Sequence, residues 1–191
     1  MPVNYIQNRV FFHELGHFVA HEIIFRTFGI HKTERIEIKR YGNDYAGQLV
    51  PAVPEGQDPN TPLTNQCEKI VELAYGCIFQ AVYLSTDFKE CFNHKSQGYD
   101  DASVWAGILG RIGHNKQIQI STLQNAYFTY LKESGTLVNF FKINPNKYII
   151  TITEDLGIVD INLLLADISE EIESHNAIFL VFVEKVRKII S

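Results

Sequence analysis

The sequence predicts an α+β fold that is mainly α-helical, with a small β-hairpin or sheet after its first helix. Three observations favour this class. Helical periodicity covers most of the 191 residues, one short segment near residue 36 alternates with period two, and apolar residues make up 46% of the chain. This length and composition suit one sizeable core. We therefore expect a single domain over residues 1–191, divided into a core over 1–115 and a helical C-terminal part over 116–191.

The first helix is expected over residues 7–28, because Gly16 is its only helix breaker and Gly29 stands at the C-cap position. Apolar residues occupy most of its faces, which indicates a buried helix. Residues 35–40 alternate between polar and apolar, residues 41–44 supply a turn, and residues 46–50 can return as a second strand. Four prolines in residues 51–62 then predict a loop.

The rest of the chain is predicted to be helical. Thr64 or Asn65 can cap a helix that continues to Leu84, and an irregular stretch follows over residues 88–99. Further helices are expected over 101–112, ending before Gly113, over 120–132 and over 161–190. No element is assigned to residues 145–153.

Composition and motif content exclude several classes of function. The net charge is −5 and there is no long Lys/Arg run, so a nucleic-acid surface is not expected. There is no GxxxxGK[ST] loop for ATP, no signal peptide and no apolar run long enough for a transmembrane segment. Three cysteines without a CxxC pair, Cys67, Cys77 and Cys91, suit a reducing compartment. The expected location is the cytoplasm.

The segment HELGH on the first helix carries the strongest chemical signal. Residues four apart lie on one helix face, so His13 and His17 can both direct imidazole nitrogens at one zinc ion. Glu14 lies about 100° around the helix, where its carboxylate can serve as general base. The alternative is a chance pair of histidines. However, two histidines and a carboxylate are costly to bury unpaired on an otherwise apolar helix, and a metal would pair all three.

A catalytic zinc ion needs a third protein ligand. His21 lies one turn beyond His17, and side chains from three consecutive turns spread too far apart to bind one tetrahedral zinc ion. We expect His21 in the core or in contact with a ligand. The helix over 101–112 has an apolar stripe, and on a helical wheel Asp101 lies about 15° from its centre whereas Asp100 lies about 110° away. A carboxylate on a buried face either binds something or caps the helix. Asp101 is therefore the preferred third ligand, and a role as an N-cap or as a first-turn acid favoured by the helix dipole stays open.

The order of four segments resembles the peptidase domain of the FtsH family, the ATP-dependent zinc proteases, over roughly residues 10–112. The segments are HELGHFVAH, RIEIKRYGNDYAGQLV, ELAYGCIFQAV and GYDDASVWAGIL. The resemblance implies a helical, zincin-like core and assigns the roles of metal ligands to His13, His17 and Asp101, with Asp100 as the fallback, and of catalytic acid/base to Glu14. The chain departs from the family at residues 76–80, GCIFQ, where a Gly-Arg-Ala-Ala-Glu run is expected, and it lacks the ATPase module.

The segment HELGH followed by a further histidine also resembles the ImmA/IrrE group of zinc peptidases. In that group the third ligand is a glutamate. Glu68 or Glu72 would then fill that place, but on an amphipathic helix we expect both to face solvent.

The predicted function is therefore peptide-bond hydrolysis by a zinc-activated water molecule, with Glu14 as general base and a peptide or protein as substrate. A non-catalytic interaction module is the alternative from another class, because the charges expected in residues 76–80 are lost. Homo-oligomerisation and a separate partner ATPase both stay open.

Overall fold

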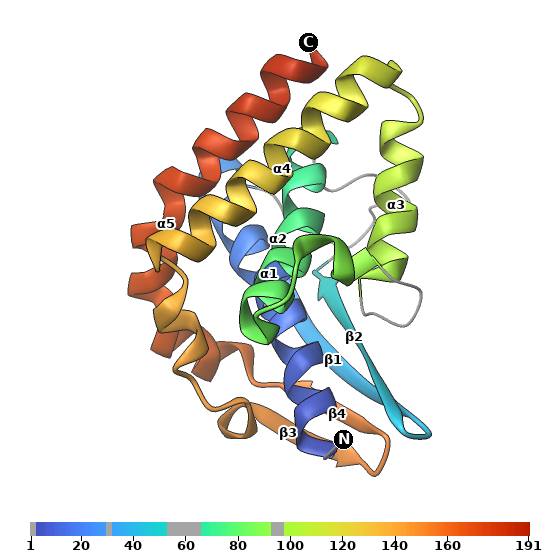
Figure 1. Ribbon diagram of the computed structural model, residues 1–191. Helices are drawn as coiled ribbons and strands as arrows, with labels where there is room; N and C mark the ends of the chain where they lie inside the picture. The colour runs from blue at the N-terminus through green and yellow to red at the C-terminus, as the bar shows by residue number, and fades with distance from the viewer. Residues whose placement is uncertain (1–2, 30–31, 53–65, 93–97) are drawn as a thin grey trace.

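The computed structural model describes residues 3–29, 32–52, 66–92 and 98–191. The protein combines long helices with one small antiparallel sheet, which confirms the predicted mainly α-helical α+β class (Figure 1). The described helices and strands are, in order, α1 (Val3–Phe28), β1 (Thr33–Tyr41), β2 (Asp44–Pro51), α2 (Gln66–Leu84), η1 (Phe88–Phe92), α3 (Tyr99–Leu109), α4 (His114–Ser134), η2 (Val138–Phe141), η3 (Pro145–Lys147), β3 (Ile149–Thr153), β4 (Leu156–Val159) and α5 (Ile161–Ile190).

Helix α1 is the central element, and residues 10–24 are all buried. It packs closely against α2, because Gly16 lies directly over the backbone of that helix. A Cβ atom at Gly16 would lie 2.3 Å from the carbonyl oxygen of Tyr75. The helix ends at Gly29, whose φ of 69° is in the left-handed region that favours glycine. Both glycines of the first helix therefore have a structural role.

The sheet has the strand order β2-β1-β4-β3, and every neighbouring pair is antiparallel. The buried side chains of β1 include Ile36 and Ile38, two residues apart as one face of a strand requires. They pair in register with Val159 and Gly157 of β4, which are also buried. Strands β2 and β3 form the two edges of the sheet. One edge strand, β2, runs beside the helix that carries HELGH (Figure 1).

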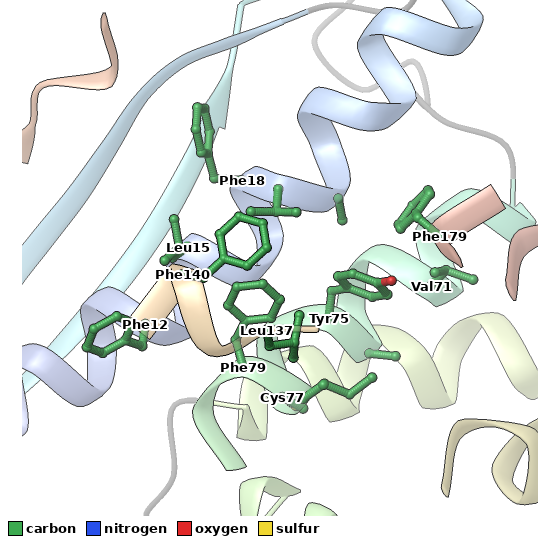
Figure 2. Packing of buried hydrophobic residues seen from close by; sticks show 14 of the residues in the cluster. Phe12, Leu15, Phe18, Val71, Tyr75, Cys77, Phe79, Leu137, Phe140 and Phe179 are labelled. Atoms are coloured by element: carbon green, nitrogen blue, oxygen red, sulfur yellow. The ribbon is translucent and has the colours of Figure 1, made fainter. Parts of the chain in front are cut away.

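The core joins apolar side chains from the helices at both ends of the sequence. Figure 2 shows Leu15 of α1 near Phe140 of η2, and Phe179 of α5 near Val71 and Tyr75 of α2. The rings of Phe79 and Phe140 have centroids 5.3 Å apart. One polar pair lies within this core: the Tyr75 hydroxyl and His175 Nε2 are 2.8 Å apart, so each buried group has a partner.

The predicted hairpin and the helix over 161–190 are confirmed, as is the second helix, which begins at Gln66 and ends at Leu84. The first helix begins at residue 3 rather than 7. Helix α4 begins at 114 rather than 120, because residues 114–119 are polar except for Ile118 and show no periodicity. Helix α3 spans 99–109 rather than 101–112. Residues 145–153 hold η3 and strand β3, and β4 follows at residue 156. The predicted loop beyond Ala52, the caps Thr64 and Asn65, and residues 93–97 lie outside the described residues.

Cys67, Cys77 and Cys91 are free thiols. Within the described parts of the chain, no helix combines the length and apolar composition needed to cross a lipid bilayer.

Candidate metal centre

His13 and His17 lie one turn apart on α1, and their imidazole rings meet the first turn of α3. Their Nε2 atoms are 3.0 Å apart. Oδ2 of Asp101 lies 2.8 Å from Nε2 of His13 and 2.9 Å from Nε2 of His17. The structure therefore brings together the three residues predicted as ligands, although 84 positions of sequence separate Asp101 from the nearer histidine. Asp100, the fallback, is exposed to solvent and lies at the rim of the same cavity.

The spacing of these three atoms can be compared with what a metal ion requires. Bonds of about 2.0–2.1 Å to a tetrahedral zinc ion place neighbouring ligand atoms about 3.3 Å apart. The observed distances of 2.8–3.0 Å are close to this value, and two imidazoles with one carboxylate form a donor set that zinc accepts. Among the described residues, the cluster is one of two in which three such donor atoms lie within 4.8 Å of one another. The residues therefore fit a divalent metal ion.

The ring of His17 is oriented from behind by the backbone of α2. Its Nδ1 lies 3.1 Å from the carbonyl oxygen of Glu72, so Nδ1–H donates to this oxygen and Nε2 faces the cluster. The nearby Gly76 makes room for the ring, since a Cβ atom there would lie 2.3 Å from Nε2 of His17. Helix α2 thus sets both the tautomer and the position of this side chain.

The metal-free cluster is held together by charge. Burial by itself would lower the pKa of His13 and that of His17, but the Asp101 carboxylate outweighs it and raises both values above the ordinary range. Burial would likewise raise the pKa of Asp101, yet the two histidines hold it well below its usual value. Asp101 is therefore ionised at neutral pH, and a proton is retained among the three groups.

Glu14 lies at the wall of the same cavity, between α1 and the edge strand β2. Its side chain is 3% exposed and rests on Gly47, where a Cβ atom would lie 2.4 Å from Cγ of Glu14. Burial raises the pKa of Glu14, although the nearby His17 and His13 and the backbone N–H of Leu49 oppose this shift. A carboxylate with a raised pKa beside a cation-binding cluster is well suited to accept and return a proton.

The cavity in front of these groups has a volume of about 390 Å³. It is open to solvent, and its floor is formed by the cluster and Glu14. Strand β2 borders it through residues 46–49, and α2 borders it through Lys69, Glu72 and Leu73. An edge strand, a buried carboxylate and the cluster therefore face one space.

The other candidate ligands occupy different environments. His21 is buried in the core, as predicted, with Nδ1 3.1 Å from the Thr33 hydroxyl. The expectation that Glu68 and Glu72 face solvent is wrong, because α2 is covered on nearly all sides and both side chains are buried. The carboxylate of Glu68 pairs with Arg187 at 2.9 Å, and that of Glu72 pairs with Lys69 at 2.8 Å.

The apolar stripe expected on the third helix is also only partly correct. Val104 is 49% exposed, Trp105, Ile108 and Ile112 are half-buried, and only Leu109 is fully buried. The short helix packs at the surface, so its apolar residues are less covered than the periodicity suggests. The helix has Gly98 as its N-cap and no capping side chain, so Asp101 is not the N-cap. It is an acid in the first turn of α3, so that part of the alternative agrees with the structure.

Three residues at the site were not singled out from the sequence: Gly47, Gly76 and Cys91. Glycines within a strand and a helix are signals of close approach by another group, and both have that role here. Cys91 lies 3.9 Å from Nδ1 of His13 through its Sγ atom. No local pattern predicts this contact.

No family model, curated protein or solved structure gives a significant match to this chain. Its function is therefore inferred from the chemistry of the site.

Proposed function

We propose that this protein is a zinc-dependent metallopeptidase, similar to the peptidase domain of the FtsH family, with His13, His17 and Asp101 as metal ligands. The proposal is supported above all by one observation: two Nε2 atoms and one carboxylate oxygen lie within 2.8–3.0 Å of each other beside a buried glutamate. Buried ionisable groups are costly unless paired, and one divalent ion pairs all three ligands.

Zinc at this position would supply Lewis-acid activation of water and of a substrate carbonyl. Glu14 would take the proton from the attacking water and return it to the leaving amine. Burial raises the pKa of its carboxyl group, which brings its proton affinity nearer to neutral pH. Gly47 allows this side chain to stay beside β2 instead of turning away from the cavity.

An extended peptide is the substrate class that suits the cavity. Strand β2 is at the edge of the sheet and borders the cavity through residues 46–49, next to Glu14. A peptide can bind an exposed strand edge through main-chain hydrogen bonds, with little dependence on its side chains. We propose that peptides or flexible segments of proteins bind along β2, with the scissile bond near Glu14.

The test compares zinc content with hydrolysis of a fluorescently labelled unfolded protein. We expect about one zinc ion per chain and measurable hydrolysis by the wild-type protein. Glu14→Gln should keep the zinc and lose about 100- to 10,000-fold in rate, because it removes only the general base. Glu22→Gln is a matched control: Glu22 is buried on the same helix but pairs with Arg26 at 2.8 Å, and we expect hydrolysis within about threefold of wild type.

Two outcomes would contradict the proposal. Wild-type hydrolysis by Glu14→Gln would remove Glu14 from the mechanism. Zinc binding without any hydrolysis by the wild-type protein would favour the non-catalytic interaction module, in which the cluster serves only to hold α1 and α3 together.

A further inference from the structure

The side of His13 that faces away from Asp101 meets a pair of buried thiols. Nδ1 of His13 lies 3.9 Å from Sγ of Cys91, and both residues are only 1% exposed. Cys91 is in η1, and Sγ of Cys77 on α2 forms a hydrogen bond with it. The two sulfurs and a ring nitrogen of His13 all lie within 4.8 Å of one another. This thiol pair, Cys77 and Cys91, is not used in the proposed chemistry.

Cys91 fills a position that a metal site requires. An imidazole that presents Nε2 to a metal carries its proton on Nδ1, and this N–H needs an acceptor. For His17 the acceptor is the backbone carbonyl of Glu72. For His13 the structure places Sγ of Cys91 there instead. A buried cysteine is most often only a small core residue, but here an apolar replacement would leave a buried N–H without its acceptor.

The thiol pair also contacts the segment that carries the third ligand. A Cβ atom at Gly98, the residue before α3, would lie 2.6 Å from the sulfur of Cys77 and 2.6 Å from that of Cys91. Gly98 is three residues before Asp101. Both sulfurs thus lie against the start of the helix that brings the carboxylate to His13, and Cys91 also contacts the ring of His13.

We propose that Cys91 is a positioning residue: its sulfur accepts the Nδ1–H of His13 and thereby keeps Nε2 directed at Asp101 and His17. The expected effect of Cys91 on zinc affinity rests on the proposed function. The hydrogen bond between Cys91 and His13 does not. Cys91 then does for His13 what the α2 backbone does for His17.

The test measures zinc affinity by competition with a chromophoric chelator. Cys91→Ala should weaken binding about 10- to 100-fold, and Cys91→Ser should restore most of it because a hydroxyl oxygen can accept the same N–H. Cys77→Ala is the matched control, since its side chain is equally buried and has the same volume. We expect it to stay within about threefold of wild type. Equal losses in the two alanine variants would indicate general packing and overturn the assignment, as would wild-type affinity in Cys91→Ala.

A second measurement uses the metal-free protein and separates this proposal from the proposed function. Nitrogen-15 NMR of labelled histidine reports whether Nδ1 of His13 holds a slowly exchanging proton. We expect one in the wild-type protein and in Cys91→Ser, and rapid exchange in Cys91→Ala. An unprotonated or rapidly exchanging Nδ1 in the wild-type protein would overturn the proposal even if zinc binds. A protected proton in a chain that fails to bind zinc would retain the hydrogen bond and contradict only the metallopeptidase.

Discussion

Replacing Asp101 by alanine is the sharpest test of the candidate metal centre. Oδ2 of Asp101 is one of three converging donor atoms, 2.8 Å from His13 and 2.9 Å from His17. Structural zinc sites with four ligands bind with about 10–16 kcal/mol, so one ligand contributes roughly 3–4 kcal/mol. Because about 1.4 kcal/mol corresponds to tenfold in affinity, Asp101→Ala should weaken zinc binding by about 100- to 1,000-fold.

Two neighbouring acids provide matched controls for this substitution. Asp100→Ala changes the preceding residue, whose side chain is exposed, and we expect zinc affinity within about threefold of wild type. Glu72→Ala removes a buried carboxylate that pairs with Lys69 but keeps the backbone carbonyl that accepts the Nδ1–H of His17. Its effect should stay within about tenfold. Affinities are measured near pH 7.5 by chelator competition, and circular dichroism checks that each variant is folded.

The results discriminate between the candidate families as well. Unchanged zinc binding by Asp101→Ala would refute the three-ligand cluster. Loss of zinc in Glu72→Ala or Glu68→Ala, with Asp101→Ala unaffected, would favour the ImmA/IrrE-like interpretation. If none of these changes affects zinc, the claim of a catalytic metal is withdrawn in favour of the interaction module.

Three further predictions concern packing and pH. Gly76→Ala places a Cβ atom 2.3 Å from Nε2 of His17, so we expect zinc affinity to fall at least about tenfold, whereas Gly107→Ala, which meets nothing within 4 Å, should leave it unchanged. Gly16→Ala forces α1 from the backbone of α2 and should lower the free energy of unfolding by about 1–3 kcal/mol in urea titrations; an unchanged midpoint would contradict this. Burial lowers the pKa of His175 to about 4, so the neutral ring stabilises the fold above its unfolded pKa of about 6.5. About 3 kcal/mol of that stability is lost as the pH falls from about 6.5 through about 4, and a metal-free His175→Gln protein should show a flatter pH dependence than wild type.

The local part of the site could be predicted because helix geometry alone determines it. His13, Glu14 and His17 lie within five residues, and the 3.6-residue repeat places the two histidines on one face wherever the helix packs. The hairpin, α2 and α5 were predictable for the same reason, since their periodicity is read over adjacent residues. The wheel position of Asp101 agrees with its contact with the two histidines, although the stripe used to argue it is only partly buried.

Residues far apart in the sequence could be placed only by the tertiary structure. Strand β4 pairs with β1 across more than a hundred residues and joins β3 to the sheet. The exposed Ile150 and Ile152 conceal the alternation of β3. Glu68 and Glu72 are buried because α1 and α5 both pack on α2, which a helical wheel for one helix cannot show.

The sequence by itself thus determined which residues carry the candidate chemistry, and the tertiary structure decided how they are supported. Gly47 beside Glu14, the Glu72 carbonyl behind His17 and Cys91 behind His13 all come from other elements. The physical reason is that covalent geometry sets spacing within one helix. Contacts between helices and strands depend instead on how the whole core packs.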